Sequence, residues 1–376
     1  MKYRKIGNTE LRASIVGFGG MRFFNEDERT AMATIGRALE CGINLFETGV
    51  YYGDGKSEEW IGKALKLAGA DRDKLVIANK AGVSMLPSGD EVRASLEGSL
   101  QREGVDYFDL FSFWGCNTRE MFDNIMRPGG PLEAMLKAKD QGLVRAIGLT
   151  VHAQPDLILE FAGEHHWDCI TLKEHILHSR QQQTITALGE MGTGVIVMSP
   201  LAGGVVALPG DAVRARLDAA EITAAQLGLR YLIANPAMTC AISGMTTPEE
   251  VDENVRAGDD DGPLSETERE LADFLQERTQ RLEKPFCTSC GYCLPCPQEV
   301  NIPGIFKLWN ILRGYGNKDY SKLEYQKMRE QRHWADFPGK SAEACVECGA
   351  CEKRCPENLP IIEHLKRAHT QLTADA

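Results

Sequence analysis

The chain has 376 residues, of which 43% are hydrophobic and 26% charged, and this length predicts one large domain and one small one. The formal net charge of −12 argues against nucleic acid or an anionic membrane as a partner, since both require clustered Lys and Arg. No apolar run is long enough to span a membrane and the N-terminus lacks the apolar stretch of a signal peptide, so we expect a cytoplasmic protein.

Residues 3–11 predict a hairpin around Gly7-Asn8, and a regular alternation of strands and helices follows. The predicted strands are apolar runs at 14–20, 44–48, 74–80, 108–114, 145–151, 169–175, 194–200 and 239–245. The predicted helices are amphipathic segments at 27–41, 57–68, 91–104, 131–141, 155–163, 181–191, 223–234 and 248–257. Eight such units predict an α/β fold of the (β/α)₈ TIM-barrel class, with an open doubly wound sheet as the competing topology.

An acidic stretch rich in Gly and Pro ends this alternation near residue 258, and one more helix is expected to run to about Leu282. Lys284-Pro285 then marks the expected boundary between a barrel domain, residues 1–283, and a second domain, residues 284–376. Helical spacers around 303–313 and 321–334 and a terminal helix from Pro360 predict a small, mostly α-helical domain.

Eight of the twelve cysteines lie in two short runs, "CTSCGYCLPCP" and "CVECGACEKRCP". In a reducing compartment such runs indicate metal ligands, and the second has the C-x2-C-x2-C-x3-C-P spacing of bacterial ferredoxins. Because the fourth cysteine of each run binds the other cluster in two-cluster ferredoxins, we predict two [4Fe–4S] clusters. The predicted ligands are Cys287, Cys290, Cys293 and Cys355 for one cluster and Cys345, Cys348, Cys351 and Cys296 for the other. Two structural zinc sites are the alternative.

Chemistry in a (β/α)₈ barrel takes place at the carboxyl ends of the strands. The residues that the predicted strands bring there are Gly19, Gly20, Glu47, Tyr52, Lys80, Trp114, Cys116, His152, Glu174, His175 and Ser199. A tyrosine beside a lysine is suited to proton transfer, because a nearby cation favours the phenolate and so lowers the pKa of the phenol.

Four stretches of the barrel together resemble the aldo-keto reductase family. "GINLFETGVYYGDGKSEEWIGKAL" resembles the family's signature and "VIANKAG" its lysine strand. "GVIVMSPLAGG" and "SGMTTPEEVDENV" are similar to the stretches that hold the dinucleotide. The resemblance covers roughly residues 1–260, and one subgroup of these reductases carries a ferredoxin-like appendage of the same kind.

The resemblance implies a tyrosine that acts as general acid toward a carbonyl, a lysine that lowers its pKa, an aspartate that anchors the lysine and a histidine that orients the substrate. Tyr52 and Lys80 match the first two positions, and Glu47 stands in place of the aspartate. Trp114 occupies the histidine position, where its indole can orient or enclose a substrate but cannot titrate.

The resemblance also implies NAD(P)(H) as cofactor. The matching cofactor-binding positions are Gly20, Met21, Thr150, Ser199, Leu201, Gly203, Gly244, Thr246, Glu253 and Asn254. Two positions depart from the family, because Thr171 and Glu174 replace the amide and the stacking tyrosine that hold the nicotinamide ring. Thr246 also stands where a preference for NADP requires a basic residue, so the choice between the two nucleotides stays open.

The residues expected to line the substrate pocket are Phe23, Tyr51, Cys116, His152, Glu174 and His175, with loops 115–130 and 203–222 at the barrel mouth. The aromatic side chains favour a ring or a sugar face as ligand. His152, Glu174 and His175 form a small metal site in an alternative interpretation, since imidazole and carboxylate are common metal ligands.

Three functions are consistent with these features. The first is a nicotinamide-dependent oxidoreductase acting on a carbonyl or alcohol of a small molecule, with the clusters exchanging electrons with a redox partner protein. The second lacks the nicotinamide step and feeds electrons singly through the clusters to a flavin or metal in an altered barrel mouth. The third is an electron-transfer subunit whose barrel is a docking scaffold; the retained Tyr52–Lys80 pair counts against it.

Overall fold

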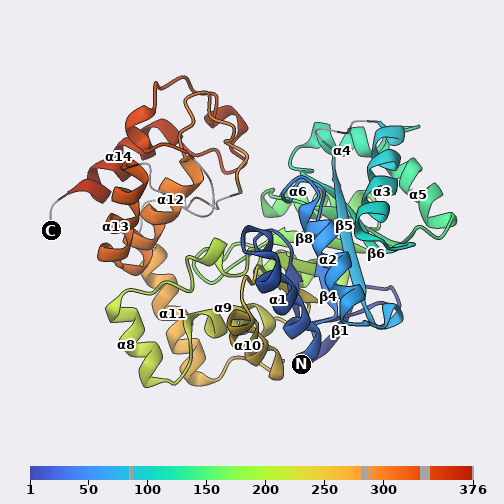
Figure 1. Ribbon diagram of the computed structural model, residues 1–376, viewed down its shortest axis with the longest axis horizontal. Helices are drawn as coiled ribbons and strands as arrows, with labels where there is room; N and C mark the ends of the chain where they lie inside the picture. The colour runs from blue at the N-terminus through green and yellow to red at the C-terminus, as the bar shows by residue number, and fades with distance from the viewer. Residues whose placement is uncertain (84–85, 87, 281–286, 288–289, 331–338, 375–376) are drawn as a thin grey trace. The chain divides into compact units, whose positions relative to one another are not determined.

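The computed structural model describes residues 1–83, 86, 88–280, 287, 290–330 and 339–374, and the chain forms two compact units (Figure 1). The first unit comprises Met1–Glu174, Arg180–Pro200 and Leu229–Leu264, and the second comprises His175–Ser179, Leu201–Gly228 and Ser265–Ala376. The expected boundary at 283/284 lies outside the described residues. The chain enters the second unit more than once, since residues 201–228 already belong to it.

The first unit contains a closed barrel of eight parallel strands, as predicted (Figure 1). The strands follow the order β10-β3-β4-β5-β6-β7-β8-β9 around the barrel. Their bounds are β3 Val16–Gly19, β4 Leu45–Glu47, β5 Val76–Gly82, β6 Phe108–Trp114, β7 Val144–Thr150, β8 Cys169–Lys173, β9 Gly194–Met198 and β10 Cys240–Ser243. Each overlaps one of the eight predicted strands, which excludes the open doubly wound sheet.

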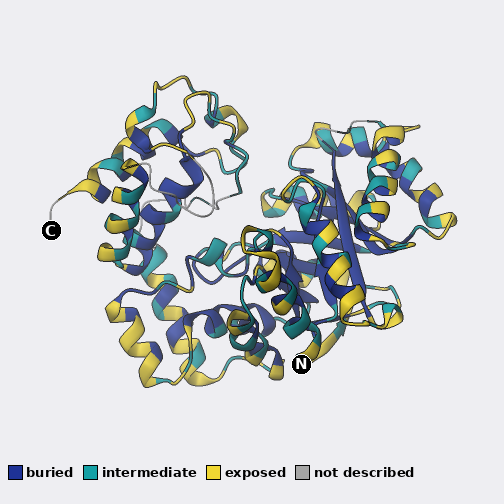
Figure 2. Ribbon diagram, in the orientation of Figure 1, coloured by how far each residue is buried: buried dark blue, intermediate teal, exposed yellow. Residues whose placement is uncertain are grey.

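Alternate residues of these strands fill the barrel interior. Because side chains alternate between the two faces of a strand, one set points inward and the other packs against the helices. The inward set forms one buried cluster with Leu45, Val76, Ala78, Leu110, Ala146, Cys169, Ile196, Cys240 and Ile242. Figure 2 shows the barrel strands mostly dark blue, since both faces are covered. We call these inward-facing residues the interior series. The series also includes the residues at the same alternating positions toward the carboxyl end of each strand.

An antiparallel hairpin closes the amino-terminal end of the barrel. Strands β1 (Tyr3–Lys5) and β2 (Arg12–Ser14) form the predicted hairpin, and Ile6 and Ala13 beside them belong to the buried interior cluster. Gly7 lies in the left-handed region with a φ of 51°, and a Cβ there would stand 2.5 Å from the backbone nitrogen of Gly194. The hairpin can approach the barrel this closely only with glycine at that position.

Helices surround the strands within the first unit, and side chains cap several of them. They are α1 (Glu28–Glu40), α2 (Lys56–Leu67), α3 (Gly89–Glu103), α4 (Arg119–Met126), α5 (Pro131–Asp140), α6 (Pro155–Glu164), α7 (Gln182–Glu190) and α10 (Pro248–Arg256). Asp27 caps α1 by accepting from the amide of Thr30, and Ser88 and Glu91 form a capping box on α3.

Two predicted mouth loops contain helices instead. Residues 115–130 include α4, which Thr118 caps by accepting from the amide of Met121, and which buries Phe122 and Ile125. Residues 203–222 include α8 (Asp211–Ala219), which buries Val213 and Leu217. Each helix has only two buried positions over eight or nine residues, a periodicity too short to stand out in the sequence.

The second unit is mostly helical, as predicted. Its helices are α8, α11 (Glu266–Gln280), α12 (Ile302–Asn310), α13 (Lys318–Arg329) and α14 (Ile361–Thr373), and α9 (Ala224–Ile233) begins there and ends in the first unit. α12, α13 and α14 pack around a core that includes Phe306, Trp309, Tyr325 and Leu365. Within the described residues, no helix has both the length and the apolar character needed to cross a membrane.

Candidate active site and cysteine clusters

The carboxyl ends of β4 and β5 bring an acid and a base together in the barrel interior. Glu47 ends β4 and Lys80 lies on β5, both in the interior series, and the ammonium of Lys80 forms an ion pair with Oε1 of Glu47. Their side chains are 12% and 5% exposed, so the pair is shielded from water. Gly49 leaves room for the lysine, because a Cβ there would lie 3.2 Å from Lys80 Cε.

Tyr52 lies directly above this ion pair. The ammonium of Lys80 is 4.5 Å from the centroid of the Tyr52 ring. The turn that carries the tyrosine is fixed by its backbone, since the amide of Tyr52 donates to the carbonyl of Gly49 at 2.9 Å and its own carbonyl accepts from Ser57 at 3.2 Å. The structure thus brings together the three residues that were predicted to form the proton-transfer site.

Burial changes the pKa of Lys80. Desolvation lowers the pKa of Lys80 to about 7, and the carboxylate of Glu47 opposes the shift by favouring the ammonium form. A lysine with a pKa near neutrality can change its charge within the physiological range, which an exposed lysine cannot.

The backbone of Glu47 is held by close packing with the strand before it. The amide of Gly20 donates to the carbonyl of Glu47 at 2.7 Å, and the hydroxyl of Ser57 donates to the carbonyl of Gly20 at 2.7 Å. A Cβ on Gly20 would lie 2.7 Å from the Ser57 oxygen and 2.9 Å from the Glu47 carbonyl. Gly20, predicted to bind cofactor, therefore also holds the ends of β3 and β4 together.

Trp114 and Tyr51 form an aromatic wall beside the site. Their ring centroids are 5.2 Å apart with the planes tilted by 33°. The Tyr51 hydroxyl accepts from the amide of Gly82 at 3.2 Å, and burial raises the pKa of this phenol. Trp114 ends β6 in the interior series, where the sequence analysis expected it.

His152 continues the interior series of β7, and its imidazole is neutral. Its backbone amide donates to Oδ1 of Asn117 at 2.8 Å. Burial, together with the positive charges of Lys173 and Lys80, lowers the pKa of His152 to about 3, so both lysines lie near the ring.

Lys173 is a charged residue of the mouth that the sequence analysis missed. It ends β8, and because Cys169 and Thr171 belong to the interior series, alternation points Lys173 inward as well. The sequence does contain a signal for Lys173, because alternation along the predicted strand 169–175 puts Cys169, Thr171 and Lys173 on the same face.

The other expected pocket residues are placed differently. Glu174 follows Lys173 on the opposite face, is 1% exposed, and its Oε2 accepts from the amides of Arg180 and Gln181 at 3.0 and 2.8 Å. Phe23 has no exposed surface and packs edge-on against Phe18 at 5.4 Å.

Cys116 is likewise fully buried, and desolvation raises the pKa of its thiol to about 12, which keeps it protonated. His175 belongs to the second unit, where it pairs with His178 through an isolated β-bridge.

Four of the expected nucleotide positions follow β10 or lie in α10, namely Gly244, Thr246, Glu253 and Asn254. Asn254 is 4% exposed, and within the described residues its Oδ1 is buried without a hydrogen-bond partner, which is the state expected of a group that awaits a ligand donor. The amide of Thr246 donates to Glu250 at 2.7 Å in front of the α10 N-terminus.

The remaining residues that were expected to bind the cofactor differ in their solvent exposure, and two of them belong to the second unit. Gly244 and Met21 are exposed, Glu253 and Ser199 are half-buried, and Thr150 is buried. Ser199 has a φ of 53° after β9. Leu201 and Gly203 belong to the second unit.

The cysteine ligands expected for the first cluster are neighbours in the second unit. The pKa of the Cys293 thiol is raised by burial and then by the negative charges of Cys287, Cys290 and Cys355, so these four sulfurs lie together. The amide of Asn310 donates to the carbonyl of Cys287 at 2.8 Å.

Arg354 joins the two cysteine runs. It precedes Cys355 and donates to the carbonyls of Cys293, Leu294 and Pro295 at 3.3, 3.0 and 2.9 Å.

The ligands expected for the second cluster line one small cavity. Cys296, Cys345, Cys348 and Cys351 all contribute to its wall, with Val300, Ile302 and Leu365 among the apolar residues around them. Both sets of four therefore fit the crossed ligation of a two-cluster ferredoxin. Among the described residues, no group of three or more His, Cys, Asp or Glu side chains is placed to hold a single metal ion.

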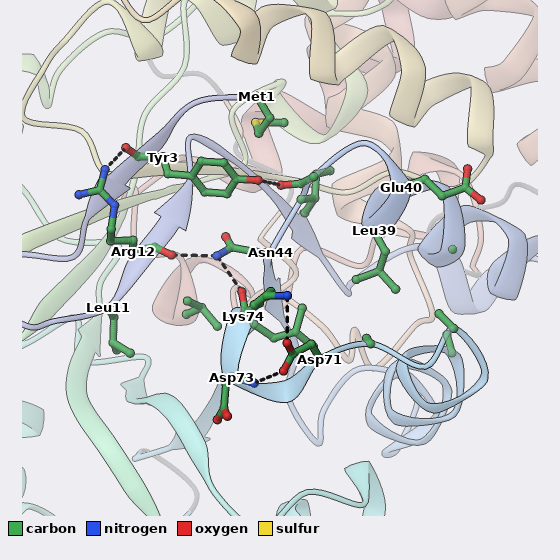
Figure 3. Close-up of a pocket in the computed structure, with 18 of the residues that line it drawn as sticks. Met1, Tyr3, Leu11, Arg12, Leu39, Glu40, Asn44, Asp71, Asp73 and Lys74 are labelled. Carbon is green, nitrogen blue, oxygen red and sulfur yellow. Dashed lines mark hydrogen bonds and ion pairs between the residues drawn. The ribbon is translucent and has the colours of Figure 1, made fainter.

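A broad cavity lies at the opposite end of the barrel (Figure 3). It is lined by the amino-terminal ends of strands, among them Asn44, Val76 and Arg145, and by the hairpin. Asn44 bridges the carbonyls of Arg12 and Lys74 at 2.9 and 3.2 Å, as Figure 3 shows. These bonds fasten the hairpin to the barrel, so this end contributes to the stability of the fold.

An eight-stranded barrel with a buried lysine–carboxylate pair under a tyrosine, joined to a cysteine-rich unit, defines an oxidoreductase with an iron–sulfur appendage. The comparisons with known proteins agree. Residues 15–273 match the aldo/keto reductase family and residues 286–359 match the 4Fe-4S dicluster domain. The chain belongs to the aldo/keto reductase family.

Individual relatives match about seven tenths of this chain. L-galactose dehydrogenase of Arabidopsis thaliana is 31% identical over 304 residues, 71% of this chain and 93% of the relative. The NADH-specific methylglyoxal reductase of Escherichia coli K12 is 28% identical, with 73% and 100% covered. Among solved structures, the holo form of an aldo-keto reductase from Bacillus halodurans has a TM-score of 0.62 at 25% identity, with 73% of this chain and 96% of that chain covered.

Proposed function

We propose that the barrel catalyses nicotinamide-dependent reduction of a carbonyl, or oxidation of the corresponding alcohol, on a small molecule. The observation that carries the proposal is the buried Lys80–Glu47 ion pair with its ammonium 4.5 Å from the centroid of the Tyr52 ring. A phenol in this position donates a proton to a developing alkoxide, and the ammonium beside it stabilises the phenolate that remains. The reduced nicotinamide supplies the hydride when it is bound.

Glu47 and Trp114 have supporting roles in this proposal. Glu47 fixes the Lys80 ammonium and favours its charged form, so Tyr52 can act as an acid near neutral pH. Trp114, packed against Tyr51, excludes water and directs the substrate toward Tyr52.

The nucleotide is proposed to lie along β10 and α10, with Asn254 Oδ1 accepting from its base. We further propose a preference for NAD(H) over NADP(H). Glu249 and Glu250 occupy the first turn of α10, and their charges repel a 2′-phosphate there. The name of the NADH-specific relative from Escherichia coli points the same way.

The second unit is proposed to hold two [4Fe–4S] clusters that exchange electrons with a redox partner protein. Each cluster handles one electron and a hydride carries two, so an additional carrier is needed if the clusters and the barrel are coupled directly. Thr171 and Glu174 at the nicotinamide-ring positions favour the second candidate, an enzyme that takes electrons through the clusters without nicotinamide.

Tyr52→Phe tests the proposed acid. The variant is expected to bind nucleotide with unchanged affinity and to lose roughly 10²- to 10⁴-fold in kcat, because the ring remains and only the hydroxyl is removed. Steady-state kinetics and nucleotide titration measure the two effects, with Tyr51→Phe as the aromatic control. Turnover that survives in Tyr52→Phe means that another group is the acid, and failure of the wild type to bind NAD(H) or NADP(H) rejects the nicotinamide step.

A further inference from the structure

We propose that Asn79 is a positioning residue of the proton-transfer site. Two buried carboxyl groups, those of Glu58 and Glu103, orient its side chain, and this side chain holds the strand that carries Lys80 to the helix that follows Tyr52. The inference rests on the proposed function, since it assigns the contacts that keep the proposed acid and its lysine together.

Asn79 lies behind Lys80 on β5. The two residues are consecutive, so alternation directs Lys80 toward the barrel interior and Asn79 toward the surrounding helices. Asn79 is 2% exposed, and its Oδ1 accepts from the backbone amide of Lys80 at 2.7 Å. This bond fixes the backbone from which the Lys80 side chain extends.

Two carboxyl groups determine which way the Asn79 carboxamide points. Its Nδ2 donates to Oε1 of Glu58 at 3.0 Å and to Oε2 of Glu103 at 3.1 Å. An amide nitrogen has two hydrogens, so these two bonds use its full capacity as a donor. The reversed orientation would place Oδ1 against two acceptors, and Oδ1 is therefore directed at the amide of Lys80.

The two carboxyl groups differ in charge. Glu58 has no exposed surface, forms an ion pair with Arg102 through Oε2 and lies in the first turn of α2, where the helix dipole favours an anion. Burial raises the pKa of Glu103 well above its usual value, which favours the neutral acid. The bond from Asn79 opposes this shift and the charge of Glu58 reinforces it. Asn79 thus bonds to one carboxylate and one neutral acid.

The network joins the two elements that carry the proton-transfer pair. Glu58 belongs to α2, and the turn before this helix carries Tyr52, whose carbonyl accepts from the amide of Ser57 at 3.2 Å. Lys80 belongs to β5. A shift of this helix along the strand would move the phenol away from the ammonium, and displacements of about 1 Å in such a site can cost roughly 100-fold in rate. Asn79 opposes that shift because it bonds to both elements.

Paired substitutions of Glu103 test the assignment. Glu103→Met keeps the approximate size of the side chain but removes the acceptor, whereas Glu103→Gln retains an acceptor oxygen for Asn79 Nδ2. Glu103→Met is expected to lower kcat roughly 10-fold or more with nucleotide affinity unchanged, and Glu103→Gln to stay within about twofold of the wild type. Asn79→Ala, which removes all three bonds, should lose at least as much as Glu103→Met. Equal kcat in Glu103→Met and the wild type, or equal losses in both Glu103 variants, overturns the proposal.

The pKa of Lys80 gives a second measurement, one that requires no turnover. Nuclear magnetic resonance of protein containing isotope-labelled lysine follows the titration of Lys80, and Lys80→Met identifies its signal. Glu103→Met and Asn79→Ala are expected to lower this pKa by roughly half a unit to one unit, because the ammonium moves away from the Glu47 carboxylate that favours it. Glu103→Gln should leave the pKa unchanged.

This titration separates the inference from the proposed function. Phe161→Leu is the control for a general loss of stability, since it disturbs the stacking of Phe161 on Phe122, whose ring centroids are 4.3 Å apart. A pKa that moves in Glu103→Met and Asn79→Ala alone supports the positioning role even if no carbonyl is reduced with either nucleotide, a result that rejects the proposed function alone. A pKa that is the same in every variant, or that moves as far in Phe161→Leu, overturns the inference whatever the activity.

Discussion

Lys80 combines two opposing influences, burial and the neighbouring carboxylate of Glu47. Burial lowers its pKa to about 7, so the lysine is charged below that pH and neutral above it. Since the proposed acid depends on the charged form, carbonyl reduction is expected to fall as the pH rises through about 7, approaching a tenfold loss per pH unit beyond it. The pH dependence of kcat/KM between pH 5.5 and 9.5 measures this, and a flat profile would separate Lys80 from the proton transfer.

Glu47→Gln tests the direction of the second influence. Removing the carboxylate removes the charge that favours the ammonium, so the pKa of Lys80 falls and the descending limb of the profile moves to lower pH by about one unit or more. Glu59→Gln, an exposed carboxylate of α2, should leave the profile in place. Movement of the limb to higher pH contradicts the assigned role of Glu47.

The sequence predicted the positions of some individual residues better than those of others. Tyr52, Lys80 and Glu47 were found because their motifs are long, and the structure brings them together. Lys173 was not predicted because it ends a strand, and its inward orientation depends on the register of that strand in the barrel. Phe23 was expected at the pocket, but its burial depends on contacts with Phe18 that the sequence does not display.

At the scale of elements, two helical glycines allow a matched test of close packing. In α2, a Cβ on Gly62 would meet the carbonyl of Glu103 at the end of α3, whereas Gly36 in α1 has nothing within 4 Å of that position. Gly62→Ala is therefore expected to destabilise the protein by about 1–3 kcal/mol and Gly36→Ala to stabilise it by about 0.5–1 kcal/mol. Denaturant unfolding followed by circular dichroism compares them, and an equal gain for both would mean that α2 and α3 do not approach so closely.

Strands were predicted better than short helices. Each of the eight barrel strands is a short run rich in apolar residues, so both its existence and its order could be predicted from the sequence. Helices α4 and α8 bury two residues each, and loops of comparable composition would look the same. The division of the chain into these two units could not be predicted from the sequence, because residues 201–228 join the second unit through contacts with distant segments.

At the scale of the whole molecule, the crossed cysteine assignment makes a quantitative prediction. Anaerobically purified wild type is expected to contain about eight iron and eight sulfide ions. Cys355→Ala and Cys296→Ala should each lose about four iron and four sulfide ions. A different cluster should remain in each variant, and electron paramagnetic resonance of the reduced protein distinguishes the two. Cys41→Ala, which alters a cysteine outside both sets, is the control. A colourless protein with two zinc ions would reject the clusters, and identical residual spectra for the two variants would reject the crossing.

The hairpin beneath the barrel has a consequence for how reactants pass through the enzyme. Within the described residues, Ile6 and Ala13 close one end of the packed interior, which leaves the opposite end for entry. The proposed nucleotide and substrate would then enter by the same end, so whichever binds deeper is expected to bind first and leave last. Product-inhibition patterns should consequently reveal a compulsory sequence of arrivals and departures, not a random one.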